Sequence, residues 1–251
     1  MNSRYVVLVV CDVEDWSSRP AVAQQHIQVA LSALMDRALT RIGINRSETS
    51  RALRGDGMII VLPGSTDKPL VTTKLVDALR EGLIEYTTRA DDDEQMRLRL
   101  VLHAGDAVIG DGELAGAAVV QACRVVDSDV TRRVLSASQG APLVLAVTGS
   151  WHQSTVAEGF VSGKGFEKVT AQAKGFAEAV WIRVPGRSSV PGLTATDRTG
   201  TERMPTDASR PDRASHGISI SGGVVNGPVF NNSQFGGDYV QGNKIVGRVS
   251  G

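Results

Sequence analysis

An uninterrupted apolar run near the start of the chain places the strongest constraint on its fold. Residues 5–10 read Tyr-Val-Val-Leu-Val-Val, without the polar alternation of a strand that has one solvated face. Such a run predicts a strand buried on both faces, in the centre of a sheet. The acidic segment Asp-Val-Glu-Asp follows at 12–15, so Asp12 is expected to emerge where this strand leaves the core.

A second acidic turn precedes another apolar run. Gly55-Asp56-Gly57 leads directly into Met-Ile-Ile-Val-Leu at 58–62, and Asp-Gly supplies the positive φ angles of a tight hairpin. If the two strands are neighbours, Asp12 and Asp56 face each other, and carboxylates that close repel unless a cation lies between them. Hard oxygen ligands of this kind suit Mg²⁺ or Mn²⁺ together with the phosphates of a nucleotide.

The remaining periodicity predicts an α+β sheet with helices packed on it. Apolar residues at helical spacing indicate a helix from Pro20 to Gly43 and a second amphipathic helix over about 69–88. A shorter helix is expected at about 116–128. Further strands are expected at 97–103, 143–147, 166–169 and 180–184, the last two as an antiparallel pair.

In this order, the segments from about 5 to 185 resemble the class III nucleotidyl cyclase catalytic domain, whose sheet is ferredoxin-like. The family's first metal aspartate opens a segment matched by residues 12–17 (Asp-Val-Glu-Asp-Trp-Ser), and its second lies in a Gly-Asp-Gly hairpin, here residues 55–57. The family strand Arg-x-Arg-x-Gly-x-His-x-Gly is matched at 97–105. The family helix Gly-x-x-Val-Asn-x-Ala-x-Arg is matched at 116–124, and the Lys-Gly turn before the last strand at 174–175.

The resemblance implies a role for five residues. Asp12 and Asp56, with the backbone carbonyl of Val13, would bind Mg²⁺ or Mn²⁺. Arg124 matches the arginine that steadies the pentavalent phosphorus, and Lys174 matches a lysine that holds the triphosphate. The family brings its metal aspartates and its arginine from different protomers, so the resemblance implies a homodimer with composite active sites.

The chain departs from the family at three positions that concern the sugar and the base. Val120 replaces the asparagine that orients the ribose, Ala52 replaces a lysine that reads a purine, and Ala117 occupies another base-reading position. Purine specificity and turnover are therefore open. Related cyclases in bacterial anti-phage signalling make cyclic CMP or cyclic UMP, which makes pyrimidine nucleotides candidate substrates by analogy.

Each candidate residue also has a purely structural interpretation. Asp12 could simply end a strand, Asp56 could fill a turn, and Lys174 could be an ordinary turn lysine. Arg124 could pair with Asp127 on the surface of its helix. Three functions thus stay open: a nucleotidyl cyclase, a catalytically degenerate module that binds nucleotide or dimerises, and a scaffold whose tail recruits a partner.

Composition narrows the class of protein and the environment in which it works. The 251 residues contain 27 basic and 27 acidic side chains, so no strong basic field predicts a nucleic-acid partner. We expect neither a signal peptide nor a membrane span. The two cysteines are expected to be free thiols in a reducing cytoplasm.

The sequence predicts three regions. Residues 1–185 would form the cyclase-like domain, and residues 186–215, rich in Pro, Ser, Thr and Arg, a disordered linker. Residues 216–251 are rich in Gly and Asn, with an apolar residue about every fifth position. That pattern indicates either a short β-repeat that binds a protein partner or a disordered tail.

Overall fold

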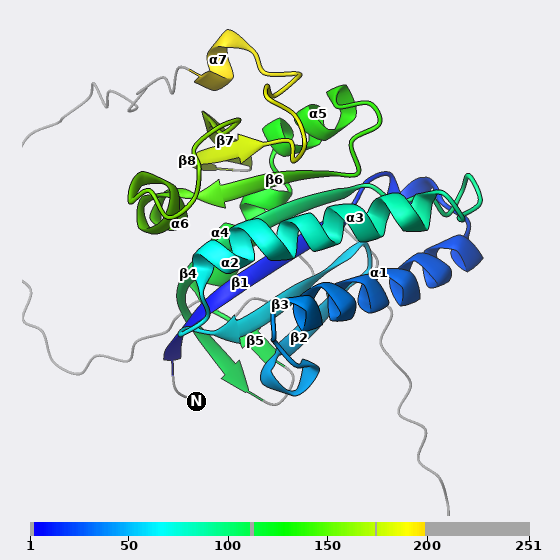
Figure 1. Ribbon diagram of the computed structural model, residues 1–251, viewed down its shortest axis with the longest axis horizontal. Helices are drawn as coiled ribbons and strands as arrows, with labels where there is room; N and C mark the ends of the chain where they lie inside the picture. Colours follow the sequence, from blue (N-terminus) through cyan, green and yellow to red (C-terminus); the bar gives the residue numbers. More distant parts are fainter. Residues whose placement is uncertain (1–2, 111–112, 174, 199–251) are drawn as a thin grey trace, which may run out of the picture. The chain divides into compact units, whose positions relative to one another are not determined.

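The computed structural model describes residues 3–110, 113–173 and 175–198 of the chain (Figure 1). In this part of the chain the strands form an eight-stranded sheet. Its strands are β1 (Ser3–Val13), β2 (Ser50–Arg54), β3 (Gly57–Pro63), β4 (Leu98–Gly110), β5 (Glu113–Ala115), β6 (Leu143–Thr148), β7 (Glu167–Ala173) and β8 (Phe176–Arg183). The spatial order is β2-β3-β1-β4-β6-β8-β7, and β5 pairs with β4. The β4–β6 pair is parallel, and the other pairs are antiparallel.

Helices cover both faces of this sheet. On one face, α1 (Ala21–Arg41) lies beside α3 (Val76–Thr87), which continues α2 (Lys68–Leu70) and the π-helical turn η3 (Val71–Leu75) (Figure 1). On the other face lie α4 (Ala117–Val126) and α5 (Asp129–Ala137). The shorter elements are η1 (Trp16–Ser18), η2 (Arg46–Glu48), α6 (Gly149–His152), η4 (Gln153–Ala157) and α7 (Ala195–Arg198). The predicted α+β architecture is confirmed.

Strand β1 lies in the middle of the sheet and is buried on both faces, as its composition predicts. Val7, Val9 and Cys11 belong to the core under α1 and α3, whereas Val6 and Leu8 belong to the core under α4 and α5. Because neighbours flank both edges of β1 and helices cover both faces, its carboxyl end has a fixed position. Asp12 stands at that end.

Several elements differ from the sequence prediction: β5 was not expected, and β7 and β8 are longer than the strands expected at 166–169 and 180–184. Two further differences concern α4 and β4. The helix expected at 116–128 ends at Val126, and α5 follows after a break at Ser128, whose buried hydroxyl donates to the Val125 carbonyl at 2.8 Å. Strand β4 continues past the expected end at 103, because β1 pairs with it as far as Val108 and β5 pairs with it from Val108 to Gly110. No helix among the described residues is both long and apolar enough to cross a membrane.

The segment expected to begin the linker packs on the domain as far as it is described. Val190 is buried in the core under α5. Asp197 in α7 pairs with Arg133 of α5 at 2.5 Å, and Arg198 pairs with Glu167 of β7 at 2.9 Å. Accordingly, the described residues as far as Arg198 form one compact unit. The predicted tail at 216–251 lies outside the described residues.

Candidate functional site

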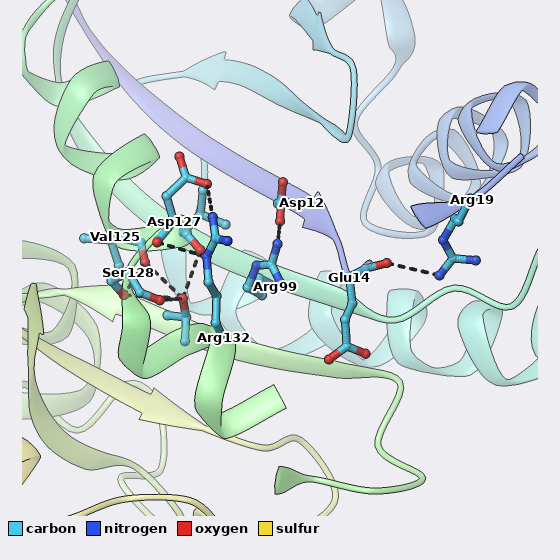
Figure 2. A network of polar contacts seen from close by, with 10 residues as sticks. Asp12, Glu14, Arg19, Arg99, Val125, Asp127, Ser128 and Arg132 are labelled. Atoms are coloured by element: carbon cyan, nitrogen blue, oxygen red, sulfur yellow. Dashed lines mark hydrogen bonds and ion pairs between the residues drawn. The ribbon is translucent and has the colours of Figure 1, made fainter. Parts of the chain in front are cut away.

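Asp12 is the penultimate residue of β1 and is only 4% exposed. In the sheet it lies opposite Gly57 of β3 on one side and opposite Arg99 of β4 on the other. Directly opposite residues of an antiparallel pair have Cβ atoms about 5 Å apart, so their side chains meet. The Arg99 guanidinium forms an ion pair with Oδ2 of Asp12 (Figure 2). Asp12 is therefore neutralised from within its own chain.

The β2–β3 hairpin brings Asp56 to the same end of β1. The Val13 N–H donates to the carbonyl oxygen of Asp56 at 2.7 Å, and the side chain of Gln28 in α1 donates to the Gly55 carbonyl at 3.0 Å. A Cβ on Gly57 would overlap the carbonyl oxygen of Cys11, so only glycine allows β3 to approach β1 this closely. The hairpin is fixed from two sides, with Asp56 half-buried.

The structure thus brings together the three residues that the sequence predicts as metal ligands, namely Asp12, Val13 and Asp56. Their donors are hard oxygens, which fit Mg²⁺ or Mn²⁺ in kind. They do not form a complete cage, because no group of three or more His, Cys, Asp or Glu side chains suited to a metal exists in the described ranges. A metal here would need ligands from a nucleotide or from water.

Further arginines surround the end of β1. Arg97 pairs with the Glu14 carboxylate at 2.8 Å, and Arg19 donates to the Glu14 carbonyl at 3.1 Å (Figure 2). On the other side, Arg132 of α5 pairs with Asp127 at 3.4 Å. The carboxylates of Glu14 and Asp127 therefore already have cationic partners.

Burial dominates the electrostatics of this region. Burial lowers the pKa of Arg99 to about 10, and the nearby Arg132 lowers it further while Asp127 opposes the change. The guanidinium thus stays protonated at neutral pH. Burial also raises the pKa of Glu14, against the influence of Arg97, and raises the pKa of Cys11 to about 12.

Arg124 does not join this cluster of residues in the described chain. It is exposed on α4, and its guanidinium lies over the Phe176 ring, 5.7 Å from the ring centroid. The predicted partner Asp127 is instead bound to Arg132. Lys174, the other predicted phosphate ligand, lies outside the described residues.

The departures from the family pattern occupy surface positions on the same side of the sheet. Ala117 is exposed and Val120 is half-buried on α4, while Ala52 is partly buried on β2 against the core under α4. None of these side chains can donate or accept a hydrogen bond. If these positions face a sugar or a base, they provide shape without polar recognition.

His103 lies buried in an apolar stretch of β4. It is 4% exposed, and its Nδ1 lies 2.8 Å from Oγ1 of Thr148. Burial, with a contribution from Lys68, lowers its pKa to about 4. A hollow of about 420 Å³ beside it, lined in part by Asp106, Gln121 and Glu178, begins four residues along β4 from Arg99. Four residues of strand span about 13 Å, so this hollow is separate from the end of β1.

Reasoning from the sequence missed Arg99. Both Arg97 and Arg99 are visible in the sequence, but neither has an assigned partner until the strand order is known. The useful signal is positional: once β1 and β4 are antiparallel neighbours, the register that pairs Val10 with Val101 also pairs Asp12 with Arg99.

Comparison with known proteins identifies the fold. No protein-family model and no curated protein matches the chain. Among solved structures, an adenylate/guanylate cyclase/hydrolase from Silicibacter pomeroyi superimposes with a TM-score of 0.53 at 20% identity, over 74% of this chain and 100% of that one. The guanylyl cyclase Cya2 gives 0.51 at 14% identity, over 76% and 98%. A bacterial light-regulated adenylyl cyclase gives 0.51 at 13% identity, over 72% and 90%. The chain therefore has the fold of class III adenylate and guanylate cyclase catalytic domains.

Proposed function

We propose that this chain, which has the fold of nucleotidyl cyclase catalytic domains, is a metal-dependent nucleotidyl cyclase. It would convert a nucleoside triphosphate into a 3′,5′-cyclic nucleotide and pyrophosphate for intracellular signalling. The observation that carries the proposal is the approach of the Gly55-Asp56-Gly57 hairpin to the end of β1 beside Asp12. In a fold of this kind, that arrangement places Asp12 and Asp56 at the same end of β1.

The chain's own residues would hold the reactants. Asp12, Asp56 and the Val13 carbonyl would bind Mg²⁺ or Mn²⁺. Two such ions would activate the ribose 3′-hydroxyl and neutralise the pyrophosphate leaving group. Arg124 would donate a fork of hydrogen bonds to the oxygens around phosphorus, and Lys174 would hold the outer phosphates as a point charge.

A homodimer would complete the site. Arg124 is exposed on α4, and its described contact is the edge of the β7–β8 hairpin at Phe176. The acidic end of β1 therefore has no phosphate-binding arginine from α4 in the same chain. A second copy would bring its α4 to that end and give two composite sites per dimer, as symmetry requires.

The base is the least determined part of the substrate. Ala52, Ala117 and Val120 offer no hydrogen bond to a base or a sugar. A site that lacks polar groups discriminates weakly between nucleotides. Pyrimidine triphosphates, and with them a role in anti-phage signalling, therefore belong in the test beside ATP and GTP.

A catalytically degenerate nucleotide-binding or dimerisation module is the second candidate. Two observations favour it: Arg99 already neutralises Asp12, and Val120 cannot bond a ribose oxygen. In this alternative the segment at 216–251 would recruit a protein partner.

Product analysis distinguishes an active cyclase from a catalytically degenerate module. Purified protein is incubated with Mn²⁺ or Mg²⁺ and each of ATP, GTP, CTP and UTP, and products are identified by mass spectrometry. The proposal predicts one cyclic monophosphate plus pyrophosphate, lost in Asp56→Asn and kept in Asp92→Asn. Asp92 is an exposed carboxylate in the loop between α3 and β4, outside the hairpin and outside the proposed ligands, so it is a matched control. No product from any of the four nucleotides would favour the degenerate module.

A further inference from the structure

We propose that Arg99 is an internal cation that competes with metal for Asp12, and that it must release Asp12 before a metal can bind. The inference rests on the proposed function, since it concerns the same carboxylate. Arg99 would be a positioning residue, acting through Asp12 and not on substrate.

The strand register fixes Arg99 next to Asp12. Arg99 and Asp12 are held opposite each other by the register of β1 and β4, with both strands in the centre of the sheet. The side chains are 9% and 6% exposed. Neither side chain lies in solvent, and the pairing of β1 with β4 keeps the two side chains facing each other (Figure 2).

Arg99 has an unsatisfied hydrogen-bond donor besides its ion pair with Asp12. Its Nε is buried and has no hydrogen-bond partner among the described residues. Asp12 is thus the main compensation for a guanidinium that burial strongly disfavours. If a metal takes Asp12, Arg99 is left buried with its charge uncompensated.

The carboxylates around Asp12 are not free to replace it: in the proposed site Asp56 would bind the same metal, and Glu14 and Asp127 pair with other arginines. Glu14 is bound to Arg97, and Asp127 is bound to Arg132. A replacement anion for Arg99 would therefore come most readily from a ligand, and the phosphates of a nucleotide have that chemistry. Metal alone should bind weakly, and metal with a triphosphate should bind more tightly, because each favours the same released state.

The test measures Mn²⁺ binding to the full chain without nucleotide, from the loss of the free Mn²⁺ electron paramagnetic resonance signal. Arg99→Met removes the competing charge and keeps most of the side-chain volume. We expect Mn²⁺ affinity to rise at least about tenfold, since breaking a buried ion pair is strongly unfavourable. Arg99→Lys retains a cation and should bind Mn²⁺ about as weakly as the wild type.

Two further variants make the result specific. Arg41→Met removes an arginine from an exposed ion pair with Glu81 and should leave Mn²⁺ affinity unchanged. Asp12→Asn should bind Mn²⁺ less well than Arg99→Met. Circular dichroism verifies folding, and Arg99→Gln replaces Arg99→Met, with the same expected gain, if the latter does not fold.

The outcomes separate this inference from the proposed function. If the Arg99→Met or Arg99→Gln protein binds Mn²⁺ no more tightly than the wild type, while Asp12→Asn weakens binding, the competition is wrong and the metal site stands. If Mn²⁺ binds to none of these proteins, even with a nucleotide present, the metal site itself is wrong and the inference fails with it.

Discussion

Replacing His103 by asparagine should remove a large part of the acid sensitivity of this fold. Burial lowers the pKa of His103 from 6.5 to about 4, so the folded chain holds it neutral. In the unfolded chain the imidazole takes up a proton below pH 6.5. Stability is therefore lost as the pH falls from 6.5 towards 4, because the unfolded state binds the extra proton.

The size of this loss of unfolding free energy follows from the shift in the pKa of His103. Each pKa unit corresponds to about 1.4 kcal/mol, so the full loss is about 3 kcal/mol, and about 2 kcal/mol of it is reached by about pH 5. The His103→Asn side chain would retain a polar group near Oγ1 of Thr148 but has no proton to gain. The variant is expected to lose about 2 kcal/mol less unfolding free energy than the wild type between about pH 7.5 and pH 5.

Urea unfolding at the two pH values, followed by circular dichroism, measures this difference. Other titrating groups act on both proteins and cancel in the comparison. Equal pH dependence in the wild type and the variant would refute the reasoning, because it would mean that His103 does not titrate differently in the two states.

Three other predictions concern local structure. Gly57→Ala should destabilise the fold by at least about 2 kcal/mol in urea unfolding, because its Cβ would overlap the Cys11 carbonyl oxygen; a neutral effect would contradict the tight hairpin. Asp197→Ala removes the partner of Arg133 and should speed proteolytic cleavage in residues 186–198 while the rest of the domain resists; unchanged cleavage would show that the ion pair does not hold this segment. Cys11 and Cys123 are buried with raised pKa values, so thiol reagents should react only on unfolding, and rapid reaction of the native protein would contradict this.

The sequence predicted the central strand and the hairpin because both depend on local composition. An apolar run such as Val6–Val10 favours burial on both faces, and Gly-Asp-Gly before a second run has few alternatives to a turn. These two features also place Asp12 and Asp56 at one end of the sheet, as found.

What the sequence could not predict depends on contacts between distant segments. The pairing of Asp12 with Arg99 requires the order and register of β1 and β4, which no local pattern encodes. The sequence argument that two facing carboxylates need a metal therefore does not apply to Asp12, which already has a cation. Likewise, composition suggested a linker from 186 onwards, whereas core burial of Val190 and the ion pairs of Asp197 and Arg198 hold its described part against the domain.

The most direct test of the central claim mixes two inactive variants. Asp56→Asn removes a proposed metal carboxylate and Arg124→Ala removes the proposed phosphate-binding arginine, so each proposed homodimer should produce almost no cyclic nucleotide. If the active site is shared between two copies, random reassociation should restore about a quarter of the wild-type rate, because half of the dimers would carry one intact site of two. No recovery, with dimers of both variants confirmed by light scattering, would contradict a composite cyclase site built from Asp56 and Arg124.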